Sequence, residues 1–267
     1  MRKWFYILFA VLPMLACVGQ KDDPVEEPDP GDPIPEAPGG ADEGKDFFRR
    51  SLVLDFTGTW CQNCPNMEAA IKTAMETRPG RIIPVSVHCK AIDPMFVKPL
   101  NDDLVKQFGV NAYPSAVVDM DPGSLISQSS PELLLNHVDR LLTGRARSAG
   151  VRVETTLKGE DYTLKAEMKA VRDGDYTLAV LVLEDGIVAA QTGGTADHVH
   201  NNILRSWTEG DPHAGLKEGD TAVLELTGTL AGSCRFVVLV LRNGLVDNVV
   251  GCAAGASVDY QYEEVTD

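Results

Sequence analysis

The sequence predicts an α/β domain over residues 46–147, followed by an all-β sandwich domain over residues 148–267. Two observations support this prediction. Between residues 46 and 147 the apolar residues alternate between the period of a strand and the period of a helix, which is typical of a sheet covered by helices. Beyond residue 148 only the strand period recurs. Because 44% of the 267 residues are hydrophobic, both parts have enough apolar side chains for a packed core.

Residues 1–16 have the pattern of a bacterial signal peptide. Two basic residues precede an apolar run that is too short to span a bilayer as a helix. The run ends in Leu15-Ala16-Cys17, which resembles the lipobox of bacterial lipoproteins. We therefore expect lipidation of Cys17 and a stable attachment to a membrane through several acyl chains. An ordinary signal peptide with an incidental cysteine is the alternative.

Residues 17–45 are predicted to form an extended tether, because acidic residues alternate with prolines along this segment. Within it, Lys21-Asp22-Asp23 resembles the signal that sends some lipoproteins to the outer face of the outer membrane, although a plain solvated linker explains these residues equally. We expect an outer-membrane lipoprotein that faces either the periplasm or the cell surface. The net charge of −15 argues against nucleic acid as a partner, since binding phosphate backbones requires clustered Lys and Arg.

The α/β part is predicted to contain strands and helices in the order β, α, β, α, β, β, α, which favours a parallel or mixed sheet. Proline and glycine mark the ends of several elements. The predicted elements are a strand over 52–56, a helix over 65–76, a strand over 82–87, a helix ending at Gly109, a strand over 116–120, a short strand around Leu125 and Ile126, and a helix that Ser130 caps and that runs to Gly144.

The sandwich part is predicted from strand patterns separated by turns. The strands are expected over residues 151–157, 162–170, 176–184, 187–191, 222–226 and 236–241. The last of these is a continuous apolar run, which indicates a strand that is buried on both faces.

The segment Trp60-Cys61-Gln62-Asn63-Cys64 lies between the first strand and the first helix of the α/β part. Cys61 is therefore expected at a helix start, where unpaired N–H groups and the helix dipole favour a thiolate. Cys64, one turn further along, can then resolve a mixed disulfide between Cys61 and a substrate. Zinc ribbons share this spacing, but they need a second such pair and the chain has none.

Asp55 stands six residues before Cys61. This spacing and the cysteine pair make the α/β part resemble thioredoxin-like proteins over about a hundred residues. The resemblance implies that Asp55 is a buried acid that accepts a proton from Cys64. An acid among Leu and Val residues would be costly without a role. A surface aspartate at a strand end is the alternative.

The segment Ala112-Tyr113-Pro114-Ser115 matches the cis-proline loop of the same proteins. The resemblance implies that Pro114 faces the two cysteines and pairs with the substrate backbone, with Tyr113 beside it and Trp60 shielding the site. On the residues alone, Pro114 would be an ordinary proline before a strand.

Four further residues carry chemistry without a clear role. His88 and Cys89 close the second strand at the sheet edge where the cysteine pair lies, so they could add redox or metal ligands there, or be a loop histidine and a buried thiol. His198 and His200 lie on one side of an extended segment, as in some metal sites. We predict no metal site, because no third ligand beyond His213 is evident.

Cys234 and Cys252 flank a predicted hairpin that turns near Asn243-Gly244. They are expected nearly opposite each other on the two strands. Because the predicted compartment is oxidising, we expect a structural disulfide between them.

Four stretches make the whole chain resemble the outer-membrane-protein-28-related lipoproteins. They are residues 56–61, 109–114, 198–205 and 237–252. That family pairs a thioredoxin fold with a β-sandwich on a lipid anchor, so the resemblance implies the architecture more than a reaction.

The leading hypothesis is a thiol–disulfide oxidoreductase of the cell envelope that acts on the thiols or disulfides of exported proteins. Cys61 is the expected nucleophile, Cys64 the resolving thiol and Asp55 the proton acceptor. Nothing in the sequence suggests a nucleotide or organic cofactor. The alternative is a surface binding or adhesion lipoprotein, in which the sandwich holds the ligand and the cysteine pair is inert. Burial of both sulfurs would favour this alternative.

Overall fold

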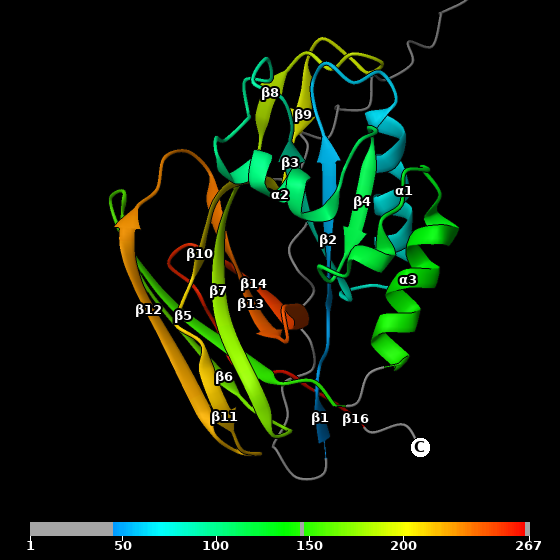
Figure 1. The fold of residues 1–267 in the computed structure, drawn as a ribbon. Coiled ribbons are helices and arrows are strands. Elements are labelled where there is room, and N and C mark those ends of the chain that lie inside the picture. The colour runs from blue at the N-terminus through cyan, green and yellow to red at the C-terminus, as the bar shows by residue number, and fades with distance from the viewer. Residues whose placement is uncertain (1–44, 145–146, 265–267) are drawn as a thin grey trace, which may run out of the picture.

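The computed structural model describes residues 45–144 and 147–264 (Figure 1). The predicted signal peptide, Cys17 and nearly all of the tether lie outside the described residues. No helix in the described part of the chain is long and apolar enough to cross a membrane.

A mixed sheet of eight strands, among the described residues, runs through both predicted domains. Its strand order is β14-β13-β7-β10-β3-β2-β4, and β11 pairs with β7. β3 is parallel to β2 and to β10, and the other pairs are antiparallel. The strands are β2 (Ser51–Thr57), β3 (Ile82–His88), β4 (Ser115–Val118), β7 (Gly174–Glu184), β10 (Ile203–Glu209), β11 (His213–Leu216), β13 (Cys234–Arg242) and β14 (Leu245–Ala253).

This sheet curls until its two ends approach each other. The Val246 N–H on β14 donates to the carbonyl of Asp119, which follows β4, at 3.0 Å. Near the start of β2, the Arg50 N–H donates to Asn248 Oδ1 at 3.1 Å. One apolar cluster inside the curl combines residues of β2, β3, β7, β13 and β14. The sheet and its core are therefore shared across the predicted boundary between residues 147 and 148.

Three helices among the described residues cover the α/β part (Figure 1). They are α1 (Cys64–Thr77), α2 (Leu100–Phe108) and α3 (Pro131–Gly144). Successive residues of β2 point to opposite faces of the sheet, so the position of a residue along the strand decides which helix it contacts. Val53 packs with α1 and α3, whereas Leu52, Leu54 and Phe56 pack with α2 inside the curl. Asp55 shares the strand parity of Val53, so it lies on the side of α1.

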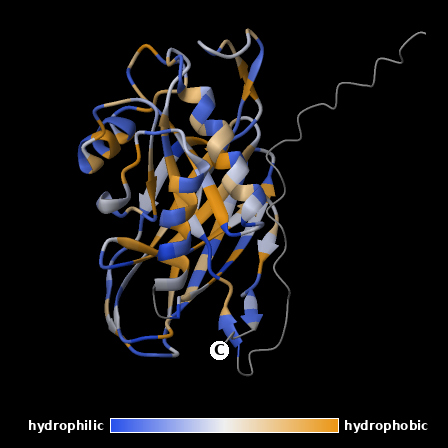
Figure 2. Cartoon of the chain, turned by 90° about the vertical axis from the view of Figure 1, so that its right-hand side faces the viewer, coloured by the Kyte–Doolittle hydropathy of each residue, from blue (hydrophilic) through white to orange (hydrophobic). Residues whose placement is uncertain are grey.

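A second sheet with the order β12-β6-β5-β15 packs against β7, β13 and β14 through an apolar cluster and so forms a sandwich. Figure 2 shows hydrophobic residues gathered on the strands and hydrophilic residues on the outside. Two short pairs complete the described fold, β1 with β16 and β8 with β9. These strands are β1 (Lys45–Phe47), β5 (Gly150–Lys158), β6 (Asp161–Lys169), β8 (Ile187–Ala189), β9 (His198–His200), β12 (Thr221–Thr229), β15 (Ser257–Val258) and β16 (Tyr262–Glu264).

Most predicted elements are confirmed within a few residues, including the cap of α3, where Ser130 Oγ accepts from the Leu133 N–H at 3.2 Å. The short strand predicted around Leu125 and Ile126 is wrong, because only a single bridge forms there, between Ala116 and Ile126. A turn of 3-10 helix, Pro122–Ser124, brings the chain back too tightly for a longer ladder.

The predicted disulfide between Cys234 and Cys252 is also wrong, since both thiols are free. The hairpin does turn at Asn243 and Gly244, both with positive φ. The turn pairs Arg242 with Leu245, which already sets Cys252 one residue out of register with Cys234. A bulge between Val240 and Leu241 adds a second residue of offset, so Cys252 lies opposite Phe236. Cys234 Sγ donates instead to the Ala231 carbonyl at 3.0 Å.

Candidate functional site

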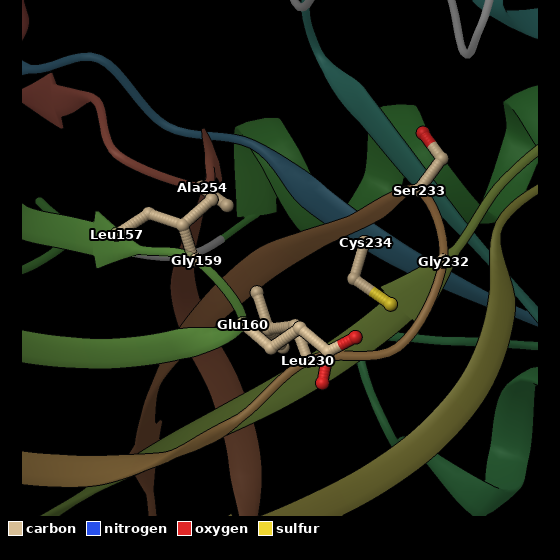
Figure 3. Close-up of a pocket in the computed structure, with 8 residues that line it drawn as sticks. All are labelled: Leu157, Gly159, Glu160, Leu230, Gly232, Ser233, Cys234 and Ala254. Atoms are coloured by element: carbon tan, nitrogen blue, oxygen red, sulfur yellow. The ribbon is translucent and has the colours of Figure 1, made fainter.

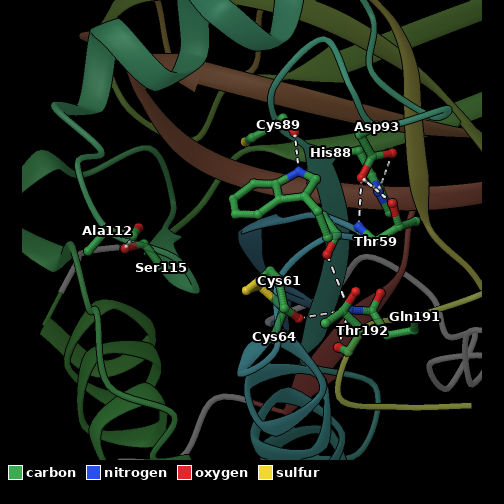
Figure 4. The surroundings of a disulfide bond; sticks show 12 residues. Thr59, Cys61, Cys64, His88, Cys89, Asp93, Ala112, Ser115, Gln191 and Thr192 are labelled. Atoms are coloured by element: carbon green, nitrogen blue, oxygen red, sulfur yellow. Dashed lines mark hydrogen bonds and ion pairs between the residues drawn. A yellow bond between two sulfur atoms is a disulfide. The ribbon is translucent and has the colours of Figure 1, made fainter.

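Cys61 and Cys64 form a disulfide at the start of α1, with their Cα atoms 5.5 Å apart (Figure 4). Cys64 is the first residue of the helix, and Cys61 lies in the loop that joins β2 to it, residues 58–63, which we call the cysteine loop. The side chain of Asn63, at the N-cap, makes no capping hydrogen bond, so the helix start stays open to a negative charge on a nearby sulfur. Both cysteines are nearly buried, with 5% of Cys61 and 2% of Cys64 exposed.

Asp55 lies in the middle of β2, between Ser86 of β3 and Ala116 of β4. It is buried, as predicted, and its Oδ1 atom has no hydrogen-bond partner. Burial, and to a smaller extent the carboxylate of Glu68 on α1, raises the pKa of Asp55 to about 8. At neutral pH this side chain therefore holds a proton that it can give up or take back.

Trp60 is fixed beside the cysteines by three contacts. Its Nε1 donates to the carbonyl of Cys89 at 2.8 Å, and its ring meets the ring of Tyr113 edge-on at 5.2 Å between centroids. The ammonium group of Lys90 lies 3.5 Å from the centre of the Trp60 ring. The peptide bond between Tyr113 and Pro114 is cis. The structure thus brings Trp60 and Tyr113 together near the disulfide.

Cys89 is a buried free thiol at the end of β3, and its Sγ donates to the Val87 carbonyl at 3.1 Å. Burial raises the pKa of Cys89 to about 12, so this thiol stays protonated. Of the two interpretations considered for Cys89, the structure therefore favours the inert buried thiol.

Asp93 connects the end of β3 to the cysteine loop. Its carboxylate accepts from the N–H of Thr59 at 2.6 Å, from the N–H of Met95 at 2.9 Å, and from Nδ1 of His88 at 3.1 Å (Figure 4). Burial alone would raise the pKa of Asp93, but these hydrogen bonds lower it. The carboxylate of Asp93 therefore links His88 by hydrogen bonds to Thr59, two residues before Cys61.

The rings of three histidines, His88, His200 and His198, contact one another in sequence, starting from the ring that binds Asp93. The ring of His200 lies 5.4 Å from that of His88 and 4.6 Å from that of His198. His198 Nε2 is 3.1 Å from the Glu68 carboxylate, one helical turn after Cys64. Burial, followed by the two neighbouring imidazoles, lowers the pKa of His200 to about 4. In the described part of the chain no three His, Cys, Asp or Glu side chains converge as metal ligands would.

The loop between β8 and β9 contacts the backbone of the cysteine loop directly. Nε2 of Gln191 donates to the carbonyl of Cys61 at 2.9 Å and to that of Gly58 at 3.2 Å. The Thr192 N–H donates to the Thr59 carbonyl at 2.8 Å. Because this loop lies in the predicted sandwich part of the chain, both predicted parts build the site.

Sequence reasoning missed Asp93, Gln191 and Glu68. Asp93 and Gln191 lie in loops that carry no periodic signal, and their roles come from contacts with residues that are distant in the chain. Glu68 had a usable signal, because it follows Cys64 by four residues and therefore shares its helix face.

A separate pocket of about 360 Å³ lies at one end of the sandwich (Figure 3). Cys234 is among the residues that line it, together with Leu157, Gly159, Glu160, Leu230, Gly232, Ser233 and Ala254. It contains none of the residues described around Cys61.

Comparison with known proteins gives structural relatives only. No family model matches the chain. No curated protein matches it in sequence. Among solved structures, HBP35 of Porphyromonas gingivalis is similar with a TM-score of 0.67 and 17% identity, over 83% of this chain and 80% of that chain.

Protein AGR_C_4864 from Agrobacterium tumefaciens is similar with a TM-score of 0.53 and 14% identity, over 81% of this chain and 96% of that one. At these identities the likeness concerns the fold alone. Both matches extend over most of the chain, so the arrangement of its parts occurs in other proteins.

Proposed function

We propose that this protein is a thiol–disulfide oxidoreductase, which acts through Cys61 and Cys64 on a thioredoxin-like α/β part. The observation that carries the proposal is a disulfide at an open helix start, on the same side of β2 as a buried, protonated Asp55. A disulfide that only cross-links needs no titratable group of this kind on the same side of the strand. Perturbed acids of this kind cluster at sites of proton transfer.

The chemistry balances with the residues present. A substrate thiolate attacks Cys61 Sγ, so the Cys61–Cys64 bond breaks and a mixed disulfide forms. Cys64 leaves as a thiolate and takes the proton that Asp55 holds at neutral pH. A second substrate thiolate then attacks its partner sulfur in the mixed disulfide and releases Cys61 as a thiolate. The net result is a substrate disulfide and two reduced cysteines. The reverse sequence reduces a substrate disulfide through the same atoms.

We further propose that the substrates are exported proteins and that the chain belongs with the outer-membrane-protein-28-related lipoproteins, anchored through Cys17. Support comes from the positions of the matching stretches. Residues 56–61 end at Cys61, residues 109–114 end at Pro114, and residues 198–205 contain His198 and His200. Incorporation of labelled fatty acid that Cys17→Ser abolishes, together with outer-membrane fractionation, tests the anchor and the location.

The direct test is equilibration of the full chain against graded ratios of reduced to oxidised glutathione. The Cys61–Cys64 state is read by alkylation and peptide mass spectrometry, which separates this pair from Cys89, Cys234 and Cys252. We expect a reversible two-electron transition that Cys61→Ser removes. A pair that stays oxidised at every ratio would contradict the proposal.

A second candidate function is a binding or adhesion lipoprotein with an inert cysteine pair. The low exposure of both cysteines favours it, because an attacking thiolate needs access to Cys61. Peptide mapping under the same glutathione series separates the two functions. An inert pair would remain a disulfide in the folded protein and would become reducible only after denaturation.

A further inference from the structure

The loop of residues 191–195, defined here as the clamp loop, makes an unusually close contact with the cysteine loop. Gly193 has φ of +81°, and a Cβ atom added to it would lie 2.0 Å from the backbone oxygen of Gln62. Backbone atoms cannot move aside as a flexible side-chain tip can. Only glycine allows this approach at this φ value.

Hydrogen bonds fix the clamp loop to the same segment. Gln191 is nearly buried, and its amide group donates to the carbonyls of Gly58 and Cys61. The Thr192 N–H donates to Thr59, and the Gln191 N–H donates to Thr195 within the clamp loop at 2.9 Å. Hydrogen bonds from one element therefore hold this backbone at three residues, Gly58, Thr59 and Cys61.

Holding this backbone has a consequence for the disulfide. Reduction separates two sulfurs, and a fixed backbone keeps them close, which raises their effective concentration and favours the bonded state. It also limits the approach of an external thiol to Cys61, of which 5% is exposed.

We infer that the clamp loop is a positioning element for the Cys61–Cys64 pair, in which Gln191 and Gly193 hold the cysteine loop in its disulfide geometry and lower its reduction potential. This inference rests on the proposed function. It assigns to the predicted sandwich part of the chain the task of tuning a redox pair that lies in the α/β part.

Two variants of the full chain test it at independent contacts. Gln191→Met keeps the side-chain size and removes the donors, and Gly193→Ala forces the clamp loop away from Gln62. Gly186→Ala is the matched control, because Gly186 has φ of +78° with open space around its Cβ position. It introduces the same backbone strain without the contact with Gln62.

We expect both test variants to shift the glutathione equilibrium of the pair toward the reduced form about tenfold relative to Gly186→Ala, which corresponds to about 30 mV. They should also accelerate reduction by dithiothreitol about tenfold and shift the pH profile of Cys61 alkylation. If Gly193→Ala fails to fold, Gln191→Met still gives the answer.

Equal equilibria and equal pH profiles in the test variants and in Gly186→Ala would overturn the inference. A wild-type pair that never exchanges with glutathione would instead contradict the proposed function. The rate of reduction by dithiothreitol would then still report whether the clamp loop protects the disulfide, so the two failures are distinguishable.

Discussion

Two pairs of cysteines lie close together in this fold, and only one pair is bonded. Cys61 and Cys64 are three residues apart at a helix start, where local geometry alone sets the 5.5 Å between their Cα atoms. Cys234 and Cys252 lie on neighbouring strands, where their pairing depends on every residue between them. The position of the turn and one bulge in the hairpin together place Cys252 opposite Phe236, so Cys234 has no partner sulfur.

The two pairs also differ in the polarity of their surroundings. Buried titratable groups, Asp55, Asp93, His88 and His200, surround the segment that contains Cys61 and Cys64. Cys252 instead belongs to an apolar cluster. Burial raises its pKa, against a hydrogen bond with Thr155. The contrast teaches that buried titratable groups surround one pair, whereas of the other two cysteines Cys252 fills space in a core and Cys234 lines a pocket.

The largest expected effect is on disulfide exchange, in which we expect only the Cys61–Cys64 pair to take part. Cys61→Ser should reduce disulfide exchange with a thiol substrate to the rate without protein, because no other sulfur in the site can be attacked. Loss of the disulfide should also lower the free energy of unfolding by about 2 kcal/mol, as expected for a short closed loop. A turbidity assay of insulin reduction and a urea titration measure these effects.

The control for this experiment is Cys234→Ser, which should leave exchange unchanged. Equal loss of exchange in the two variants would show that the comparison between the pairs is mistaken.

A smaller effect is expected from Asp55→Asn, which removes the proposed proton donor and acceptor of Cys64. Exchange should slow by about 10²-fold, as is usual when one acid–base group is lost. The pH dependence of stability should change as well. In the wild type the folded state keeps a proton on Asp55 up to about pH 8, which the unfolded chain releases near pH 4. The contribution of Asp55 to the free energy of unfolding therefore falls as the pH rises through this range.

Denaturant titrations at several pH values measure this slope, which Asp55→Asn should lack. A wild-type slope that persists in Asp55→Asn would mean that another group carries it.

His200 should give a slope of the opposite sign. Its pKa is lowered to about 4 in the folded state, while the unfolded chain takes up this proton near pH 6.5. The contribution of His200 to the free energy of unfolding should therefore rise with pH between about 4 and 6.5, where it offsets the opposite contribution of Asp55, and stay level above that range. His200→Phe should remove this rise, and His213→Phe on β11 should retain it. Equal slopes in these two variants would argue against a buried neutral His200.

The candidate site shows which parts of the structure are accessible from sequence. The Cys-x-x-Cys spacing, Asp55 and Pro114 were predictable, because short-range patterns and a resemblance to known proteins point to them. Asp93 and Gln191 were not predictable. Asp93 accepts a hydrogen bond from Thr59, 34 positions away in the chain, and Gln191 donates one to Cys61, 130 positions away. Such contacts depend on how the sheet curls, and hydrophobic periodicity contains no information about that.

The fold shows the same limit. The period of each strand predicted its existence, but not its partners. Placing β10 beside β3 joins the predicted sandwich to the α/β part through one sheet, and only the pair Ile203–Ser86 marks that junction in register. The bulge between Val240 and Leu241 is also a local feature, and no pattern in the sequence predicts it. The register set at the turn, where Arg242 pairs with Leu245, and the extra residue at the bulge each move Cys252 by one position, so the predicted Cys234–Cys252 disulfide was wrong.

The smallest expected effects test the unbonded pair directly. Cys252→Ala should lower the free energy of unfolding by about 1 kcal/mol, because it removes a buried sulfur from an apolar cluster. Cys234→Ala should change it by less than about 0.5 kcal/mol, since Cys234 is partly exposed beside the pocket at the end of the sandwich. A bonded pair would behave differently. Either substitution would then break the disulfide and cost about 2–5 kcal/mol, and the two losses would be nearly equal. Urea titrations of both variants under non-reducing conditions therefore distinguish two independent thiols from a disulfide by the inequality of the losses.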